Sequence, residues 1–169
     1  MTQKPLIREA VPEDLSILWG MIHELGAAKD AGYFEHVLER QKKSDLTLYI
    51  LHADGQAAGY GILNWQPKYG LYRKLEIPEV QDLNVMPAFR PAVCANLITH
   101  CEELARAKGR TQMGIAVSVH SSFGPAQRLY FKLGYVPDGM GATYDRAAID
   151  FAAFKPVDDQ LCLMLVKDL

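Results

Sequence analysis

Apolar residues recur at two different spacings along the chain, and the mixture of the two predicts an α/β fold. Spacings of three and four residues indicate helices over residues 15–25, 33–42, 92–108 and 124–133. Alternating or continuous apolar runs indicate strands over residues 6–10, 46–51, 57–63, 79–85, 113–119, 135–136, 143–149 and 161–166. Asp54-Gly55 is a strong hairpin signal between two of these strands. Residues 65–75 are interpreted as an elaborated connection.

The strand over residues 79–85 and the helix over residues 92–108 carry the clearest face assignments. Alternation predicts one strand face made of Glu79, Gln81, Leu83 and Val85, and another made of Val80, Asp82 and Asn84. Helical spacing predicts a buried face made of Val93, Leu97, Cys101, Leu104 and Ala105, with Glu102, Glu103, Arg106 and Lys108 in water. Gly109 stands where the end of a helix favours glycine. Both elements are expected to turn one face to the core.

A short loop joins this strand to this helix, and its position favours binding of a phosphate group. The loop holds Pro87 and Arg90, and the helix opens near Ala92. The first N–H groups of a helix have no partner inside the helix, and the helix dipole adds positive charge there. A ligand that carries phosphate is therefore expected at the N–H groups of residues 92–96, with Arg90 nearby.

Two segments resemble motifs of the GCN5-related N-acetyltransferase (GNAT) superfamily. The first matches at Val85, Pro87, Arg90, Ala95 and Leu97, and the second at Ala126, Leu129, Tyr130, Lys132, Gly134 and Tyr135. The second lies in the stretch H-S-S-F-G-P-A-Q-R-L-Y-F-K-L-G-Y, which is similar to one bacterial branch of the family. The resemblance implies an α/β (α+β) fold with a mixed, mostly antiparallel central sheet and helices on both faces. It also implies transfer of an acetyl group from acetyl-CoA to an amine, without a metal.

The same resemblance implies which residues form the site. The cofactor would be bound by Val85, Arg90, Ala92, Val93, Cys94, Ala95 and Asn96. Tyr130 would protonate the departing thiolate, since a phenol has a pKa of about 10. Glu79 would be the base that takes the proton of the amine. Glu76, Asp82 and a chain of water molecules are its rivals, and a surface or acceptor-binding carboxylate is the other interpretation of Glu79.

The phosphate-binding segment departs from the family pattern Arg/Gln-x-x-Gly-x-Gly/Ala. Arg90 and Ala95 fit, but Val93 stands at the first glycine position and Pro91 has no N–H to donate. A glycine there lets the backbone approach the pyrophosphate closely, so Val93→Gly is expected to tighten binding of CoA. Two hypotheses follow. One is an acyl-CoA-dependent N-acetyltransferase acting on a small-molecule amine or an exposed amino group; the other is a non-catalytic domain of the same fold that binds a ligand or partner.

Several other residues have two interpretations each. Trp65, Tyr69 and Tyr72 either form an apolar wall for a small amine or cover the core. His120 is expected to make hydrogen bonds within a loop rather than to take part in catalysis. Gly139 and Gly141 are typical of a turn.

Composition limits the partners and the compartment. The 169 residues are expected to form one domain, residues 1–169. A net charge of −2 gives no strong attraction to nucleic acid or to an anionic membrane, and no apolar run approaches the length of a membrane span. The three cysteines, without C-x-x-C spacing, favour reduced thiols in a cytoplasm. A homodimer is compatible with the resemblance.

Overall fold

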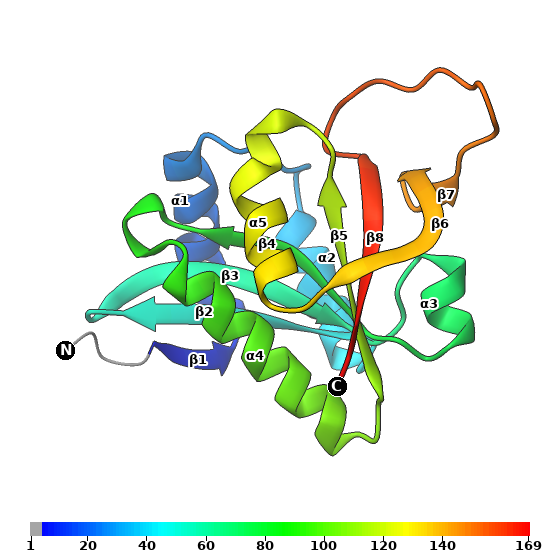
Figure 1. Ribbon diagram of the computed structural model, residues 1–169. Coiled ribbons are helices and arrows are strands. Elements are labelled where there is room, and N and C mark those ends of the chain that lie inside the picture. Colours follow the sequence, from blue (N-terminus) through cyan, green and yellow to red (C-terminus); the bar gives the residue numbers. More distant parts are fainter. Residues whose placement is uncertain (1–4) are drawn as a thin grey trace. The chain divides into compact units, whose positions relative to one another are not determined.

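The computed structural model describes residues 5–169 and shows a mixture of helices and strands along the chain (Figure 1). The strands are β1 (Leu6–Glu9), β2 (Leu46–Ala53), β3 (Gln56–Asn64), β4 (Glu79–Val85), β5 (Gln112–Ser118), β6 (Val136–Tyr144), β7 (Ala147–Ala148) and β8 (Leu161–Asp168). The helices are α1 (Leu15–Leu25), α2 (Tyr33–Lys42), α3 (Gly70–Lys74), α4 (Ala92–Ala107) and α5 (Gly124–Lys132). Short 3-10 helices cover Pro12–Asp14, Pro87–Phe89 and Ser121–Phe123.

The chain divides into two compact units, and β4 and α4 contribute residues to both. The first unit holds Met1–Trp65 and Gln81–Cys101, and the second holds Gln66–Val80 and Glu102–Leu169. The expectation of a single domain stays a prediction. Among residues 5–169, no helix has the length and apolar character that crossing a membrane would require.

The first unit contains strands in the order β1-β2-β3-β4, with antiparallel pairing of β1 to β2 and of β2 to β3. The predicted hairpin between β2 and β3 is confirmed. Asp54 and Gly55 form its turn, with φ angles of 50° and 78°. Positive φ at both central residues matches the twist of the two strands, and Asp-Gly adopts it at low cost.

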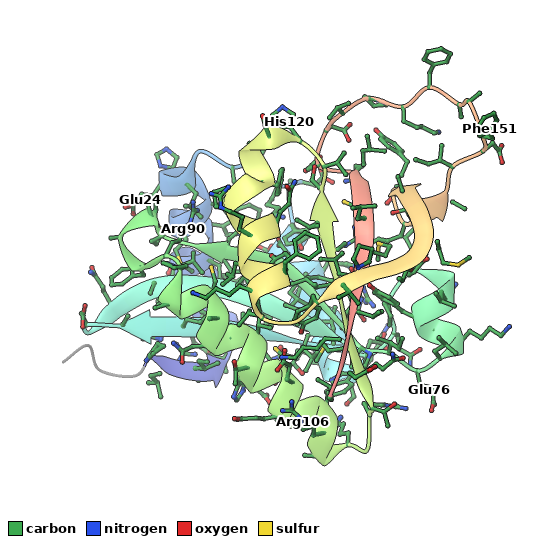
Figure 2. The ribbon with its side chains drawn as sticks, in the orientation of Figure 1. Glu24, Glu76, Arg90, Arg106, His120 and Phe151 are labelled. Atoms are coloured by element: carbon green, nitrogen blue, oxygen red, sulfur yellow. The ribbon has the colours of Figure 1, made fainter. Side chains whose placement is uncertain are left out.

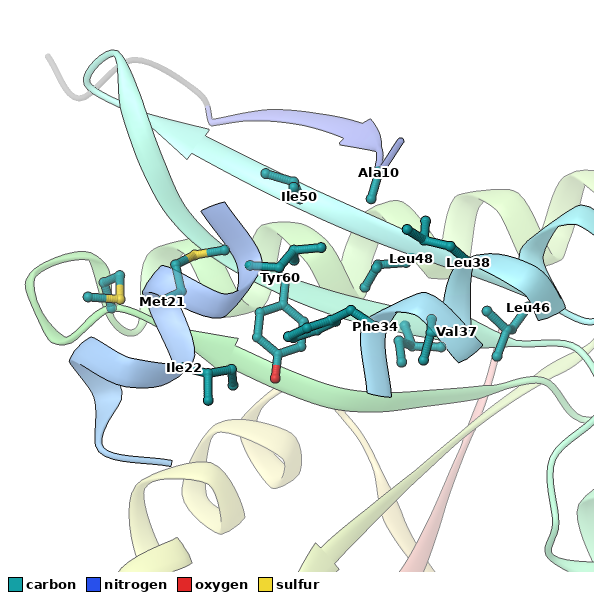
Figure 3. Close-up of a cluster of buried hydrophobic side chains, with 13 residues drawn as sticks. Ala10, Met21, Ile22, Phe34, Val37, Leu38, Leu46, Leu48, Ile50 and Tyr60 are labelled. Carbon is teal, nitrogen blue, oxygen red and sulfur yellow. The ribbon is translucent and has the colours of Figure 1, made fainter. Parts of the chain in front are cut away.

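Helices cover both faces of the β2–β3 hairpin. On one face, alternate strand residues such as Leu48, Ile50 and Tyr60 contact α1 and α2, as Figure 3 shows. On the opposite face, Gly61 lies so close to the side chain of Leu97 in α4 that a Cβ atom at position 61 would collide with it. The ring of Tyr49 also meets His100 of α4 edge to face, at 5.1 Å between centroids. Alternation along each strand therefore sorts the side chains between two helical layers.

The second unit contains strands in the order β4-β5-β8-β6-β7. Only the first two residues of β4 belong to it, and they pair in parallel with β5, Glu79 beside Gly114 and Val80 beside Ile115. The pairs β5–β8, β8–β6 and β6–β7 are antiparallel. The predicted fold class, a mixed and mostly antiparallel sheet with helices, is confirmed. The connection from β7 to β8 is exposed, and Phe151 in it is fully in solvent (Figure 2).

The predicted elaborated connection over residues 65–75 contains the short helix α3. Two other local predictions were wrong in the second unit. The strand predicted over residues 143–149 is interrupted by a tight turn at Asp145 and Arg146, which have φ angles of 49° and 62°. Gly139 and Gly141 lie inside β6 at an irregularity of the β6–β8 register, where their positive φ lets the strand bulge instead of turning back.

The predicted exposure of Glu102 was also wrong. Glu102 is only 4% exposed, because Tyr135 and Lys167 of the second unit reach its carboxylate at 2.9 Å each. A glutamate between apolar positions of a helix gives no sign in the sequence that a lysine 65 residues away will neutralise it. The pair is consistent with the rule that buried charges are matched by partners.

The predicted alternation along β4 fails at Asp82. Its φ angle is +47°, in the left-handed region, so the strand is not regular there. As a result Gln81 accepts a hydrogen bond from Asn64, and Asp82 accepts one from Tyr60. Asn64 and Tyr60 lie on the same alternating set of β3, so Gln81 and Asp82 are not on opposite faces.

Candidate functional site

The loop between β4 and α4 is held closed by the side chain of Arg90. The Nε of Arg90 donates to the carbonyl of Val85 at 2.7 Å, across the 3-10 turn that separates them. The N–H of Met86 donates to the carbonyl of Ala58 at 2.8 Å, so that N–H is already used inside the unit. Val85 itself is buried. Arg90 thus fixes the path by which the end of the strand reaches the start of the helix.

The start of α4 presents three N–H groups before its own hydrogen bonding begins. The N–H of Ala95 donates to the carbonyl of Pro91 at 3.2 Å, which makes it the first donor of the helical ladder. The N–H groups of Ala92, Val93 and Cys94 precede that bond, and the positive end of the helix dipole lies there. The side chain of Asn96 donates to the carbonyl of Ala92 at 2.8 Å. Of the five residues predicted to bind the pyrophosphate, three therefore keep backbone donors directed out of the helix.

Val93 does not need the freedom of a glycine in this position. It lies in the first turn of α4, and its side chain is 5% exposed. Leu97, four residues later on the same helix face, is fully buried as well. The side chain of Val93 therefore belongs to the core of the first unit. Because this side chain is directed into the core, Val93→Gly is no longer expected to tighten CoA, in contrast to the expectation from the family pattern alone.

In the second unit, Tyr130 is the buried residue of α5. It is 8% exposed, and its ring lies 6.5 Å from that of Tyr135, with the two planes tilted by 59°. Its carbonyl accepts the N–H of Tyr135 at 3.0 Å, which fixes the end of the helix against the chain that follows. Phe131, the next residue, is 47% exposed, so the helix turns Tyr130 and not Phe131 inward.

Glu79 forms a buried ion pair with Arg146, also in the second unit. Glu79 is 0% exposed, and the Nη2 of Arg146 donates to its Oε1 at 2.8 Å. Burial acts to lower the pKa of Arg146, but the charge and hydrogen bond of Glu79 outweigh it, so that pKa is raised. Burial, followed by the charge of Glu79, raises the pKa of Tyr72. The interpretation of Glu79 as a surface carboxylate was wrong.

Tyr69 and Tyr72 cover the core of the second unit. Tyr72 is fully buried, its ring lies against Gly114, and its hydroxyl donates to the carbonyl of Leu165. The hydroxyl of Tyr69 donates to Asp138 at 2.7 Å. Of the two interpretations of these tyrosines, the structure supports packing. His120 makes the expected loop contacts, since its Nδ1 lies 2.8 Å from the hydroxyl of Ser122 and accepts the N–H of Ser122 at 3.2 Å.

A polar cluster in the first unit surrounds Asp82. Lys29 donates to its Oδ1 at 2.6 Å, and Tyr33 donates to its Oδ2 at 2.7 Å. Tyr60 adds a bond of 3.2 Å to Oδ2, and the amide of Asn84 adds one of 2.8 Å to Oδ1. Burial, followed by the charge of Asp82, raises the pKa of Tyr60, so its hydroxyl stays protonated as a donor.

Sequence comparison gives no match to a protein-family model and none to a curated protein. Comparison of structures is informative. The chain superposes on a ribosomal-protein-alanine N-acetyltransferase from Brucella melitensis with a TM-score of 0.69 and 17% identity, covering 97% of this chain and 99% of that one. This is the GNAT fold.

Two further structures share the GNAT fold with this chain. A putative acetyltransferase from Salmonella typhimurium, solved with its cofactor acetyl-CoA, gives a TM-score of 0.66 at 16% identity, covering 98% of this chain and 94% of that one. A spermidine N-acetyltransferase from Vibrio cholerae, in complex with CoA and spermine, gives 0.68 at 13% identity, covering 98% and 95%. Identities this low establish the fold and leave the activity to be argued from the residues.

The sequence did not reveal the charged partners. Arg146 lies 67 residues from Glu79, and Lys29 lies 53 residues from Asp82. Tyr33 and Tyr60 were interpreted only as parts of a helix and of a strand. Among residues 5–169, no three His, Cys, Asp or Glu side chains gather where a metal ion could bind.

Proposed function

We propose that this protein is an N-acetyltransferase that moves the acetyl group of acetyl-CoA to the amine of a small molecule or to an exposed amino group. The observation that carries the proposal is the GNAT fold, which extends over 97% or more of the chain in each of the three comparisons. Two of those structures are described with acetyl-CoA or CoA. The residues at the start of α4 and in α5 add chemical support.

The pyrophosphate of the cofactor would bind at the start of α4. The N–H groups of Ala92, Val93 and Cys94 supply donors, and the helix dipole supplies positive charge. Arg90 would act through the loop, since its Nε holds the carbonyl of Val85 and leaves the rest of the guanidinium for an anion. Ala95 and Asn96 would contribute as the next residues of the same turn. Backbone N–H groups near Val85 would polarise the acetyl carbonyl.

The transfer itself requires the attack of a neutral amine, loss of one proton from its nitrogen, and cleavage of the carbon–sulfur bond. Tyr130 would donate its phenolic proton to the departing sulfur. Glu79 is the proposed base, but its carboxylate is buried and one oxygen already accepts a bond from Arg146. An amine that arrives unprotonated, or loses its proton to water, would make Glu79 a positioning residue instead. The pH–rate profile of Glu79→Gln separates these two roles.

The non-catalytic hypothesis receives no support from the first turn of α4. It rested on Pro91 and Val93, and Val93 is a core residue of a regular helix. Pro91 supplies the carbonyl that accepts the first helical hydrogen bond, a task that needs no N–H.

Calorimetric titration with acetyl-CoA tests the proposal, followed by detection of free thiol with a panel of amines. Binding at 100 times the dissociation constant should stabilise the fold by about 2.7 kcal/mol. Ala92→Pro removes one donor at the first helical position, where proline is well tolerated, and should weaken CoA about fivefold to tenfold without unfolding the protein. Lys42→Met on the exposed part of α2 is the control. No stabilisation at millimolar CoA would overturn the proposal.

A further inference from the structure

The side chain of Lys29 is bound by the protein in the way that proteins bind a free ammonium ion. Its Nζ lies 2.6 Å from Asp82 and 4.7 Å from the centroid of the Tyr33 ring. A carboxylate and an aromatic face are the two groups that proteins use to recognise alkylammonium groups. Both belong to the first unit, and the partners come from separate segments of the chain.

Asp82 is fixed in place by more than its lysine. Tyr33, Tyr60 and Asn84 each donate a hydrogen bond to its carboxylate. Only 14% of the Asp82 side chain is exposed, so an ammonium that reaches it loses most of its water. These three neutral donors would keep the carboxylate oriented if Lys29 left. The site is therefore built independently of the cation that fills it.

The backbone of Asp82 is strained in support of this position. Its φ of +47° is uncommon for any residue with a Cβ atom and interrupts strand β4. Conformations of this kind persist where the surroundings enforce them, and they gather at ligand sites. A regular strand would place Gln81 and Asp82 on opposite faces.

Lys29, by contrast, lies on a connection without regular structure. Residues 26–32 connect α1 to α2 without regular structure, and Ala27, Ala28 and Asp30 beside Lys29 are exposed. Gly26 and Gly32 bound the segment with φ angles of 63° and 77°. Residues at such ends can absorb the backbone change of a moving loop.

We propose that Asp82, with Tyr33, Tyr60 and Asn84, is a subsite for an ammonium group of the acceptor, and that Lys29 fills this subsite until the acceptor displaces it. The inference rests on the proposed function and deepens it. A protonated ammonium cannot attack a thioester, so the group at Asp82 is not the one that is acetylated. The acceptor class is therefore an amine with a second, cationic nitrogen.

Strand geometry sets the spacing of the two nitrogens. Asp82 and Val85 are three residues apart on β4, which corresponds to about 10 Å along a strand. An anchored ammonium at Asp82 would leave a second amine near the end of the strand in an alkyl diamine or a longer polyamine. A monoamine has one nitrogen, so it cannot occupy Asp82 and reach the end of the strand at the same time.

The test compares 1,7-diaminoheptane, whose extended chain matches this spacing, with 1-aminoheptane, which lacks the second nitrogen. Binding to the protein is measured by calorimetry without acetyl-CoA, and KM and kcat are measured with it. Asp82→Asn keeps the size of the side chain and tolerates the left-handed backbone, but it removes the charge. It should weaken binding of the diamine and lower its kcat/KM about 10-fold to 100-fold, and it should leave kcat/KM for the monoamine unchanged.

Lys29→Met keeps the apolar stem and removes the competing ammonium. It should tighten binding of the diamine at least about fivefold, which is the reverse of the effect expected for Asp82→Asn. The matched control is Lys42→Met, since Lys42 also lies 2.6 Å from a carboxylate, that of Glu39, but both side chains are 64% exposed. Lys42→Met should change the binding of neither amine.

The two proposals fail in different ways. If acetyl-CoA does not bind but the diamine does, with the opposite effects at Asp82 and Lys29, the ammonium subsite stands and the transferase proposal falls. If thiol is released with both amines at equal KM, and neither variant separates them, the subsite is overturned while the transferase proposal remains. Unchanged diamine binding in Lys29→Met would also overturn it, because Lys29 would then not occupy the same site.

Discussion

The ion pair of Glu79 and Arg146 offers the sharpest test of the physical reasoning. Glu79 is fully buried, whereas the side chain of Arg146 keeps 22% of its exposure. Removal of either partner leaves a charge inside the second unit. Loss of one partner from a buried pair costs about 3–5 kcal/mol. Arg146→Met leaves Glu79 without its guanidinium and should lie at the upper end of that range; Glu79→Gln leaves Arg146 partly in water and should cost about 3 kcal/mol.

The backbone permits a clean comparison at Arg146. Its φ of 62° strains arginine and methionine alike, since both have a Cβ atom and an unbranched stem. The Nε of Arg146 is buried and has no hydrogen-bond partner among residues 5–169, so methionine also removes an unsatisfied donor. The double variant Glu79→Gln, Arg146→Met should therefore be more stable than the sum of the single losses by about 2 kcal/mol.

Urea unfolding at pH 7 measures the three free energies. For a chain of this size, a loss of 3 kcal/mol also corresponds to a fall in Tm of about 6–12 °C. The control cycle uses Lys68 and Asp145, which lie 2.6 Å apart in the same unit with side chains 63% and 56% exposed. That pair should couple by less than about 0.5 kcal/mol. If the stability loss of the double variant equals the sum of the losses of the two single variants, the assigned pairing of Glu79 with Arg146 is refuted.

Kinetics on the same variants decide the role of Glu79. If Glu79 takes the proton of the amine, Glu79→Gln lowers kcat by about 100-fold or more and changes the acid limb of the pH–rate profile. If it only positions Arg146 and the β6–β7 turn, Arg146→Met lowers kcat by a similar factor as Glu79→Gln. The shape of the pH profile is then unchanged in both variants.

Three further outcomes are expected. Tyr130→Phe keeps the buried ring and should lower kcat by about 100-fold while CoA affinity stays within about twofold, measured by thiol release and calorimetry; equal turnover would make Tyr130 a packing residue. Val93→Gly should cost about 2–4 kcal/mol in urea unfolding and should not tighten CoA, because the side chain is buried in a helix. Asp14→Asn should lower the free energy of unfolding by about 1–2 kcal/mol at pH 7, since the hydrogen bonds of Arg8 lower the pKa of Asp14. The ionised carboxylate stabilises the fold above its unfolded pKa of about 3.9. The difference from wild type should therefore vanish as pH falls through the lower folded pKa.

The sequence predicted those parts of the fold that depend on local pattern. The β2–β3 hairpin follows from Asp54-Gly55, and the start of α4 at Ala92 follows from the apolar spacing behind it. Alternation failed at Asp82 because one residue with positive φ changes the register of faces, and no local preference of aspartate marks where that occurs. Helix α3 is only five residues long, too short for a periodic signal.

The start of α4 behind Arg90 lies where the sequence predicted it, because backbone donors at a helix start depend on local sequence alone. The role of these residues in binding a cofactor stays a prediction. The cations that donate hydrogen bonds to Glu79, Asp82 and Glu102 were not found, since they are 67, 53 and 65 residues away. A buried carboxylate in a strand or helix can be noticed in the sequence, but its counter-ion is fixed only by the folded chain.

Asp82 and Arg146 share a feature that neither pattern nor composition explains. Each is a charged residue in the left-handed region, and each forms a salt bridge with a long sequence separation. Glycine at position 146 would remove a strain worth about 1 kcal/mol, but it would leave Glu79 as a buried charge without its partner, which costs more. The strain at Arg146 is thus offset by Glu79. The strain at Asp82 has no such necessity, because Lys29 could extend into water if Asp82 were absent. A carboxylate held in a strained backbone by three neutral donors, with a cation that does not depend on it, is the arrangement expected of a site that binds something other than its own lysine.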